Sequence, residues 1–224
     1  MSEPPASDRW RAKQAHYQEQ EVARGYEAQR FASLRTRGDA ARFWRAIERA
    51  LGAELAGVRS VLDTPGGTGR FAALVARGGR RLVLADLSAA MLAEARATGV
   101  PRVQADALAL PFADASFDLV LCMRFLFHVP RELQPRVLAE LARVSRRFVA
   151  VDVRHGWAWS AWTRRVRSRL GGGRVAPRMR PSEIEPLFAE AGLALRSKRW
   201  FAPGFSEKVL VLAEKPGPVA GFRA

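Results

Sequence analysis

The sequence has little cysteine, since Cys122 is the single cysteine among 224 residues. One cysteine excludes an intramolecular disulfide and argues against a structural zinc cluster, which needs several ligands of this kind. No apolar run approaches the roughly 20 residues of a membrane-spanning helix. The polar start MSEPPASDRWRAKQ also lacks the apolar core of a secretory signal. We therefore expect a globular protein in the reducing environment of the cytoplasm.

Lysine is also scarce, with four residues, although lysine and arginine together number 37 against 22 acidic residues. The formal charge of +15 favours anionic partners such as nucleic acid, phosphorylated metabolites or acidic lipid. The alternative is a GC-rich genome, which enriches arginine, alanine, glycine and proline together without a functional reason. Both interpretations stay open, because net charge bears on association and not on fold.

Helical and strand-like patterns occupy different parts of the chain. Residues 8–55 lack strand-like runs and read as helices, and the segment GDAARFWRAIERAL places Phe43, Trp44 and Ile47 on one apolar face. From residue 60 onwards, short apolar runs alternate with helical stretches. The runs are residues 60–63, 81–86, 102–106, 117–122 and 147–153. This alternation is typical of a parallel sheet covered by helices.

The C-terminal part predicts one more helix and then a hairpin. The segment PSEIEPLFAEAGL reads as a helix with Ser182 as its N-cap and Glu185 completing a capping box. Residues 194–202 and 206–215 read as two antiparallel strands joined by a turn at Pro203–Gly204. The predicted fold class is therefore α/β, a Rossmann-like, mostly parallel seven-stranded sheet with helices on both faces and an antiparallel C-terminal edge hairpin.

Residues 154–180 interrupt the alternation with tryptophans followed by arginines. These are Trp157, Trp159 and Trp162, and then Arg164, Arg165, Arg167 and Arg169. One interpretation is a lid over a flat or lipophilic acceptor, and a second is an amphipathic segment at an acidic membrane surface. The third is a helix that packs its tryptophans on the core and leaves its arginines in solvent.

The stretch VLDTPGGTGRF, residues 61–71, places a turn of small residues directly after a predicted strand. Such a turn lets a ligand approach the main chain and directs the N–H groups of a following helix at acceptor atoms. A P-loop needs lysine and then serine or threonine after its glycines, where Arg70 and Phe71 stand. Nucleoside triphosphates are therefore disfavoured as ligands.

A dinucleotide fingerprint fits the spacing of Gly67, Gly69 and Ala72, and Asp86 is placed to bind a ribose. However, Asp63 stands just before the turn, where it would repel a pyrophosphate. A ligand with a cationic end and no phosphate resolves this conflict, and S-adenosylmethionine is such a ligand. Acidic residues also follow other strands: Asp63, Asp86, Asp106 and Asp152 all lie at predicted strand ends, which suggests a polar ligand along that edge.

Three segments together resemble class I S-adenosylmethionine-dependent methyltransferases. The pattern from Asp63 to Gly69, D-x-P-x-G-x-G, resembles their first motif, and LADLSAAMLAEAR resembles their second segment. The segment VQADALALPFADASFDLVLCMRFLFHV resembles the third and fourth. The resemblance covers about residues 60–153 and is specific in combination. Gly66 departs from the family, in which cysteine or serine is common at this position.

The resemblance implies that S-adenosyl-L-methionine is the cofactor and that particular residues bind it. Asp63 would bind the methionine amino group, Asp86 both ribose hydroxyls, and Asp106 the adenine amino group. Leu87 and Met91 would pack on the adenine, or else belong to the core. The full set of expected cofactor-binding residues is Asp63, Pro65, Gly67, Gly69, Asp86, Leu87, Met91, Asp106, Ala107 and Cys122, with Met123 beside them.

Methyl transfer from a sulfonium chiefly needs proximity and alignment, and a base helps when the acceptor is a hydroxyl or an acidic carbon. His128 is the candidate base, and the alternative is a histidine that only packs and hydrogen-bonds locally. His16 is a weaker candidate, as is His155, which follows the fifth strand and could line the pocket. The segment CMRF differs from the motif of methyltransferases that act on adenine or cytosine, so those reactions are disfavoured.

The favoured hypothesis is transfer of a methyl group to the oxygen, carbon or nitrogen of a small molecule that is aromatic, lipophilic or anionic. One alternative is an RNA or protein methyltransferase, which would use the positive field. Another is a non-catalytic scaffold that keeps the cofactor site. Nucleic acid and a membrane surface are both disfavoured as partners, and no metal ligand set is evident.

The expected domain organisation has three parts. Residues 1–55 form an N-terminal helical extension, in which Tyr17 and Tyr26 could help to close the pocket. Residues 56–215 form the methyltransferase domain with the insert at 154–180, and residues 216–224 form a flexible tail.

Overall fold

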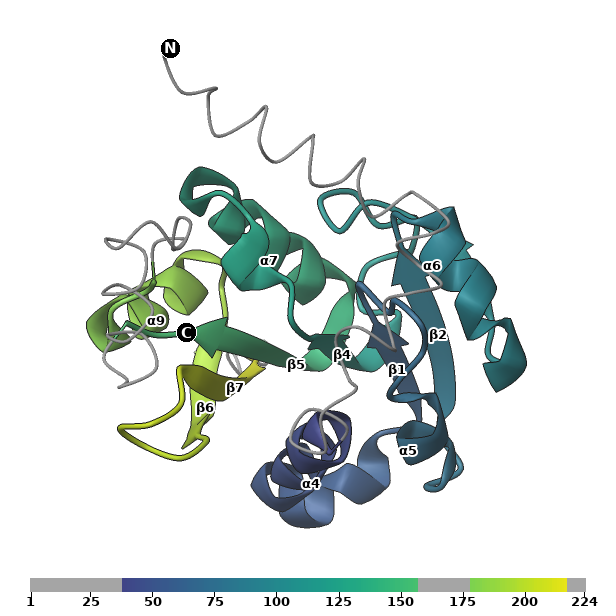
Figure 1. Ribbon diagram of the computed structural model, residues 1–224, viewed down its shortest axis with the longest axis horizontal. Coiled ribbons are helices and arrows are strands. Elements are labelled where there is room, and N and C mark those ends of the chain that lie inside the picture. The colour runs from purple at the N-terminus through teal and green to yellow at the C-terminus, as the bar shows by residue number, and fades with distance from the viewer. Residues whose placement is uncertain (1–37, 157–177, 217–224) are drawn as a thin grey trace, which may run out of the picture.

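The computed structural model describes residues 38–156 and 178–216, and a seven-stranded sheet forms its centre (Figure 1). The strand order is β3-β2-β1-β4-β5-β7-β6. Strands β1 to β5 run parallel to one another, whereas β7 is antiparallel to both β5 and β6. The strands are β1 (Ser60–Asp63), β2 (Arg81–Asp86), β3 (Arg102–Gln104), β4 (Phe117–Cys122), β5 (Ser145–Arg154), β6 (Ala194–Trp200) and β7 (Lys208–Glu214). The predicted fold class is confirmed, including the antiparallel hairpin at the edge.

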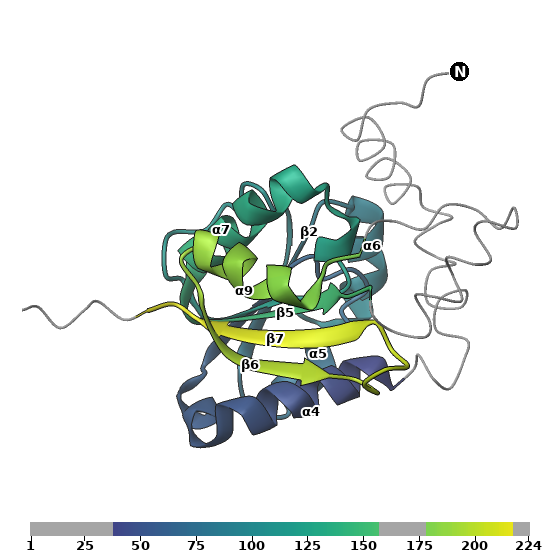
Figure 2. The ribbon, with the colours of Figure 1, turned by 90° about the vertical axis from the view of Figure 1, so that its left-hand side faces the viewer.

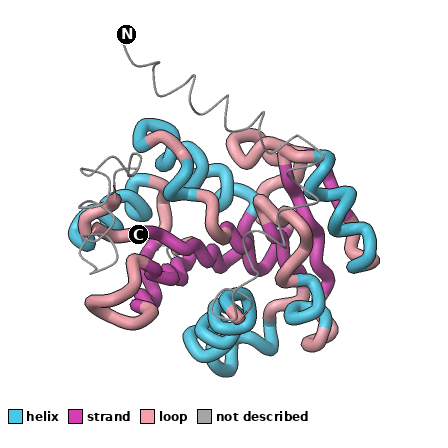
Figure 3. Tube along the Cα trace, viewed as in Figure 1, coloured by secondary structure: helices cyan, strands magenta, loops and turns pink. Residues whose placement is uncertain are grey.

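Helices surround the sheet (Figure 3). The α-helices are α4 (Asp39–Leu51), α5 (Ala72–Ala76), α6 (Ala89–Glu94), α7 (Gln134–Val144) and α9 (Pro181–Glu190). Shorter 3-10 turns span Gly52–Gly57, Ala95–Thr98, Leu126–His128 and Arg131–Leu133. Helices α7 and α9 cover one face, and α4 and α5 cover the other (Figure 2).

The middle residues of the central strands are mostly apolar because both faces of the sheet are covered. In β4, Val120 and Cys122 belong to the core under α7 and α9, whereas Leu119 and Leu121 belong to the core over α4 and α5. Successive strand side chains point to opposite faces, so a strand buried on both sides has no polar alternation. On the α4 side, the predicted apolar face of residues 38–51 packs into the core.

Two local expectations are wrong in detail. The third strand ends at Gln104 and not at residue 106, because the chain turns there and Asp106 forms a bridge with Ala109. Helix α9 has Arg180 as its N-cap, and its capping box uses Glu183, whose Oε2 accepts the Arg180 N–H at 2.6 Å. Proline fits the first helical position because its missing N–H would be unsatisfied there anyway, so the helix begins before Ser182.

Several predictions concern residues outside those that the structure describes. They include the tryptophans and arginines from 157 to 177, the early helices with His16, Tyr17 and Tyr26, and the tail from residue 217. The division of the chain at residues 55 and 215 stays a prediction. Within the described ranges, no helix combines the length and apolar character that crossing a membrane requires.

Candidate functional site

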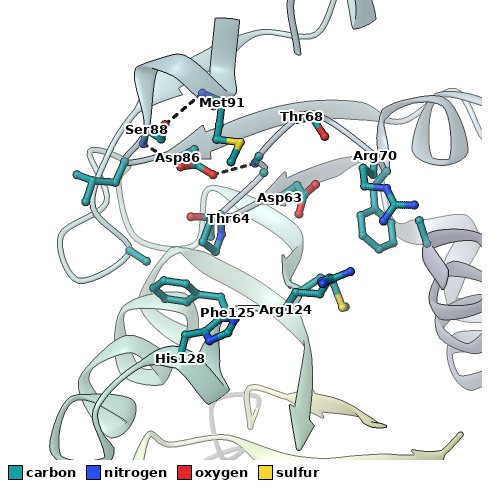
Figure 4. Close-up of a pocket in the computed structure, with 18 of the residues that line it drawn as sticks. Asp63, Thr64, Thr68, Arg70, Asp86, Ser88, Met91, Arg124, Phe125 and His128 are labelled. Carbon is teal, nitrogen blue, oxygen red and sulfur yellow. Dashed lines mark hydrogen bonds between the residues drawn. The ribbon is translucent and has the colours of Figure 1, made fainter. Parts of the chain in front are cut away.

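The candidate site is a pocket at the carboxyl-terminal edge of the sheet, beside the ends of β1, β2 and β4 (Figure 4). Parallel strands bring their carboxyl ends to one edge, so residues far apart in the sequence meet there. The pocket is lined by Asp39, Ala40, Phe43, Asp63, Thr64, Pro65, Gly66, Gly67, Thr68, Arg70, Phe71, Asp86, Leu87, Ser88, Met91, Ala105, Asp106, Ala107, Met123, Arg124, Phe125 and His128. Three of the four acids that were predicted at strand ends, Asp63, Asp86 and Asp106, thus line one pocket.

Asp63 is the last residue of β1, and its side chain lies near the middle of the pocket (Figure 4). The residue is only 2% exposed. Burial raises the pKa of its carboxyl well above the ordinary value, and the nearby negative charge of Asp86 raises that pKa further. Among the described residues, none donates a hydrogen bond to this carboxylate. A buried acid in this situation requires either a proton or a cationic partner.

Asp86 is the last residue of β2, and the backbone holds both of its oxygens in place. Oδ2 accepts the Gly67 N–H at 2.8 Å, and Oδ1 accepts the Ser88 N–H at 2.8 Å. Burial raises the pKa of this carboxyl, whereas the two N–H donors lower it. Each carboxylate oxygen can accept more than one hydrogen bond, so the fixed carboxylate can still receive two adjacent hydroxyl donors.

The turn after β1 packs closely against the neighbouring strand β2. The Gly66 N–H donates to the Ala85 carbonyl at 2.8 Å, and Gly67 has φ of +53°. A Cβ built on Gly66 would lie 3.0 Å from the Asp63 carbonyl oxygen and 3.0 Å from Leu84 Cβ. The turn packs so closely on β2 at Gly66 that a side chain there would require its neighbours to shift.

Gly69 is in the predicted motif but does not line the pocket. Its φ is +77°, and a Cβ there would lie 3.0 Å from Thr98 Cγ2 and 3.1 Å from Leu84 Cδ1. It therefore packs the turn against the 3-10 helix of residues 95–98 and against β2. Its contribution is to the shape of the turn rather than to the pocket wall.

We expect Gly69→Ala to lower the free energy of unfolding by about 2–4 kcal/mol, because it combines left-handed strain with overpacking. Gly192→Ala is the matched control, since Gly192 has φ of +72° but no atom within 4 Å of a built Cβ. Urea denaturation of both variants measures the two effects. An equal loss of stability in the two variants would show that packing at Gly69 is unimportant.

The adenine side predicted from the motif also lines the pocket. Met91 is 4% exposed and its N–H donates to the N-cap Ser88 Oγ at 3.1 Å, which fixes the start of α6 beside the pocket. Leu87, Asp106 and Ala107 also line the pocket. The Asp106 Oδ1 accepts the Leu108 N–H at 2.9 Å, so its carboxylate is oriented by its own turn.

The opposite wall comes from the segment after β4. Arg124, Phe125 and His128 lie there, across the pocket from Asp86 and Met91 (Figure 4). The His128 backbone N–H donates to the Phe125 carbonyl at 2.7 Å, which closes the turn that presents the histidine. Arg124 has φ of +60°, which is unusual for a residue with a side chain. Met123 also lines the pocket.

Cys122 and two further residues considered from the sequence lie away from the pocket lining. Cys122 is 0% exposed, and burial raises the pKa of its thiol, as do the nearby charges of Asp152 and Asp63. Asp152 lies within β5 and is also 0% exposed. His155 Nε2 lies 3.0 Å from the Ser206 carbonyl oxygen, and its ring packs edge-on against Trp200. These contacts indicate a structural role for His155.

Sequence reasoning missed part of the lining. Asp39, Ala40 and Phe43 come from α4, and Arg70 and Phe71 follow the glycine turn. The sequence predicted that the apolar face of α4 packs on the core. That the first turn of this helix lines the pocket follows only from the tertiary structure. Arg70 and Phe71 were noted only as residues that exclude a P-loop.

Residues 62–148 match the family described as "Methyltransferase domain". The chain is 42% identical over 106 residues to a demethylmenaquinone methyltransferase of Mycolicibacterium vanbaalenii, and 37% identical over 105 residues to that of Mycobacterium tuberculosis. These matches cover 47% of this chain and 45% and 44% of the two relatives. The matched region thus spans less than half the length of these curated relatives.

Two solved structures share the fold at low sequence identity. Magnesium protoporphyrin IX methyltransferase from Synechocystis, with bound S-adenosylhomocysteine, is 17% identical with a TM-score of 0.66, over 78% of this chain and 83% of that one. The 1,6-didemethyltoxoflavin-N1-methyltransferase of Burkholderia thailandensis, with its substrate and S-adenosylhomocysteine bound, is 18% identical with a TM-score of 0.67, over 97% and 93%. Residues 62–148 thus match a methyltransferase-domain family, and the described residues share their fold with these two methyltransferases.

Proposed function

We propose that this protein transfers a methyl group from S-adenosylmethionine to a small-molecule acceptor. The observation that carries the proposal is the convergence of the Asp63, Asp86 and Asp106 carboxylates with a glycine turn in one pocket. The names of the relatives described above support it, since they refer to methyl transfer to a quinone precursor, a porphyrin and a toxoflavin precursor. None of these names refers to RNA or protein as a substrate.

The residues present fit S-adenosylmethionine. The Asp63 carboxylate is buried and lacks a hydrogen-bond donor among the described residues, and the ammonium group of the cofactor would supply the missing cation. Gly67 and Pro65 leave the main chain accessible beside it. When bound, the cofactor supplies a methyl group already activated by a sulfonium.

Other residues that line the pocket would bind the ribose and the adenine of the cofactor. Asp86, held by two backbone N–H groups, would accept the two ribose hydroxyls. Leu87 and Met91 would pack on the adenine ring, and Asp106 would accept from its amino group beside the Ala107 N–H. Gly69 and Cys122 would contribute by shaping the turn and the strand behind this surface, since neither lines the pocket.

Binding of the cofactor is the first test. Calorimetry should show S-adenosylmethionine and S-adenosylhomocysteine binding at micromolar concentration, and no binding of NAD at the same concentration. A screen of acceptors for S-adenosylhomocysteine formation follows. Binding without turnover over a broad acceptor panel would favour the non-catalytic scaffold, and failure to bind either ligand would overturn the proposal.

His128 is the proposed general base for acceptors that must lose a proton. We expect His128→Gln to lower kcat by roughly 100-fold or more, in line with the usual contribution of a positioned base. Affinity for S-adenosylhomocysteine should change by less than about 3-fold, because the histidine lies on the opposite wall from Asp86. An unchanged kcat would mean that His128 only packs against its neighbours.

The remaining parts of the proposal concern the chain as a whole. We keep the division into an extension at 1–55, a domain at 56–215 and a tail at 216–224, of which the described residues cover only part. A cytoplasmic location is supported by the single buried thiol, Cys122. The acceptor is proposed to be a small molecule.

A further inference from the structure

The start of α4 forms part of the pocket wall, although little within the helix itself fixes it there. Asp39, Ala40 and Phe43 line the pocket from the first turns of this helix. The first N–H groups of a helix have no partner within the helix and are often capped by the side chain of the N-cap residue. Here the N-cap residue is Gly38, which has no side chain to accept them. The position of this wall therefore depends on tertiary contacts.

Lys208 of β7 supplies one of these contacts. Its ammonium group forms an ion pair with the Asp39 carboxylate, across 169 residues of the chain. The Asp39 side chain is 7% exposed and the Lys208 side chain 23%, so the pair is largely shielded from water. Burial lowers the pKa of Lys208, Asp39 raises it, and the positive charges of Arg154 and Arg124 lower it. Asp39 thus helps to keep the lysine charged.

Arg42 also pairs with Asp39, at 3.7 Å, but this second ion pair has a different effect. Both residues belong to α4, so their pair cannot fix the helix to the sheet. Lys208 belongs to β7, which is hydrogen-bonded to β5 on one side and to β6 on the other. Of the two cations, Lys208 is therefore the one that connects the start of α4 to a rigid element.

An aromatic contact connects the same part of α4 to the C-terminal hairpin of β6 and β7. The rings of Phe43 and Phe201 meet edge to face, with their centroids 4.8 Å apart. Further along the helix, Ile47 belongs to the same core as Leu210 of β7. In Figure 2, α4 runs along these two strands. Neither Phe201 nor Lys208 lines the pocket, so the hairpin supports this wall from behind.

We infer that Lys208 is a positioning residue for cofactor binding, because its ion pair with Asp39 fixes the start of α4 as a wall of the pocket. The inference rests on the proposed function and adds to it a residue outside the pocket. Phe71, which follows the glycine turn, also lines the pocket and belongs to the same core as Ala40 and Phe43. The α4 wall therefore adjoins the turn that is proposed to bind the cofactor. Without the ion pair, the wall would be in place for only part of the time, and the apparent affinity falls in proportion to that fraction.

Calorimetric titration of the full chain with S-adenosylhomocysteine, well below the melting temperature of each variant, tests the inference. We expect Lys208→Met, which keeps an aliphatic side chain but removes its charge, to weaken binding about 5-fold or more. Lys208→Arg keeps a cation and should bind within about 2-fold of the wild type. Lys198→Met is the matched control, since Lys198 lies on the neighbouring strand β6 and pairs with Glu185 at 3.5 Å outside the pocket lining. An exposed pair of this kind contributes little, so affinity should stay within about 2-fold.

A double-mutant cycle shows whether Lys208 acts through Asp39. Asp39→Asn keeps the shape of the side chain and removes its charge. Adding Lys208→Met to Asp39→Asn should weaken binding further by less than about 2-fold, because the ion pair is already lost. A purely structural role of Lys208 would lower the melting temperature and leave the affinity unchanged.

Hydrogen exchange in the free protein measures the wall without any ligand. The Arg42 N–H donates to the Gly38 carbonyl at 3.0 Å, which closes the first turn of α4. The amides of residues 42–45 should exchange about 5-fold faster or more in Lys208→Met, and at the rate of the wild type in Lys198→Met. Lys208→Gln should behave as Lys208→Met does, and it replaces that variant in both measurements if the methionine prevents folding.

Three results would overturn the inference. They are unchanged affinity in Lys208→Met, unchanged exchange of residues 42–45 in that variant, and an equal loss of affinity from Lys208→Met in the wild type and in Asp39→Asn. Failure of the proposed function is distinguishable, because the wild type itself would then not bind S-adenosylhomocysteine. In that case the inference about cofactor binding is wrong as well, whatever the exchange rates show of the helix.

Discussion

Asp86→Ala is expected to weaken binding of S-adenosylhomocysteine roughly 10- to 150-fold, or about 1.5–3 kcal/mol, if two charge-assisted hydrogen bonds to the ribose are lost. The substitution also leaves the Gly67 and Ser88 N–H groups without their acceptor, so the turn loses part of its support. Both effects act in the same direction on affinity. Calorimetric titration of the variant and the wild type with S-adenosylhomocysteine measures the sum.

A matched control separates loss of the ligand contact from loss of a structural anchor. Asp118 lies at the start of β4, away from the pocket lining, and its Oδ2 accepts the Arg59 N–H at 2.9 Å and the Ser60 N–H at 2.8 Å. Asp118→Ala thus removes a similar pair of backbone contacts. It should lower the melting temperature and leave cofactor affinity within about 2-fold, since sites this independent rarely couple. If Asp86→Ala binds S-adenosylhomocysteine with unchanged affinity, Asp86 does not bind the ribose.

Two acids of the pocket, Asp63 and Asp86, could be predicted from the sequence because the apolar runs of their strands end at these residues. Short apolar runs end at Asp63 and Asp86, and the parallel arrangement implied by the alternating helices brings such ends to one edge. The same rule placed Asp152 at a strand end, but β5 continues to Arg154 in register with β7. A partner strand far along the chain extends β5, and no local pattern reports that.

The opposite wall was harder to predict because it depends on contacts between distant segments. Arg124 owes its conformation to a carboxylate 28 residues later in the chain, and Asp39 meets Lys208 across 169 residues. Gly66 appeared as a departure from a motif, whereas its tight contact with Leu84 exists only once β2 lies beside the turn. Side-chain periodicity carries information about faces of elements, and not about which elements meet.

Asp63→Asn should have opposite effects on binding and on stability. The variant keeps the shape of the side chain but cannot neutralise an ammonium group, so affinity for S-adenosylhomocysteine should fall by roughly 100-fold, or about 3 kcal/mol, as for a lost charged hydrogen bond. The free protein should become more stable at neutral pH, because it no longer holds a buried carboxyl whose ionisation is disfavoured.

The pH dependence follows from the raised pKa of Asp63. The carboxyl titrates at about pH 4 in the unfolded chain and at a higher pH in the folded protein. Between these two values the folded state binds the extra proton, so the stability contributed by this group is complete below about pH 4 and is lost as the pH rises towards the folded pKa. The difference in unfolding free energy between wild type and Asp63→Asn should therefore shift in favour of the variant as the pH increases.

Cofactor affinity should respond to pH in the opposite sense. An ammonium group binds the ionised carboxylate, so S-adenosylhomocysteine should bind the wild type more tightly as the pH rises through the raised pKa of Asp63, and binding should release a proton. In Asp63→Asn this component of the pH dependence should be absent. Titrations between about pH 5 and 8 in two buffers of different ionisation enthalpy measure both the affinity and the released proton. If the wild type and the variant have the same pH profile, Asp63 does not bind the amino group, because only an ionisable partner couples affinity to a proton in this way.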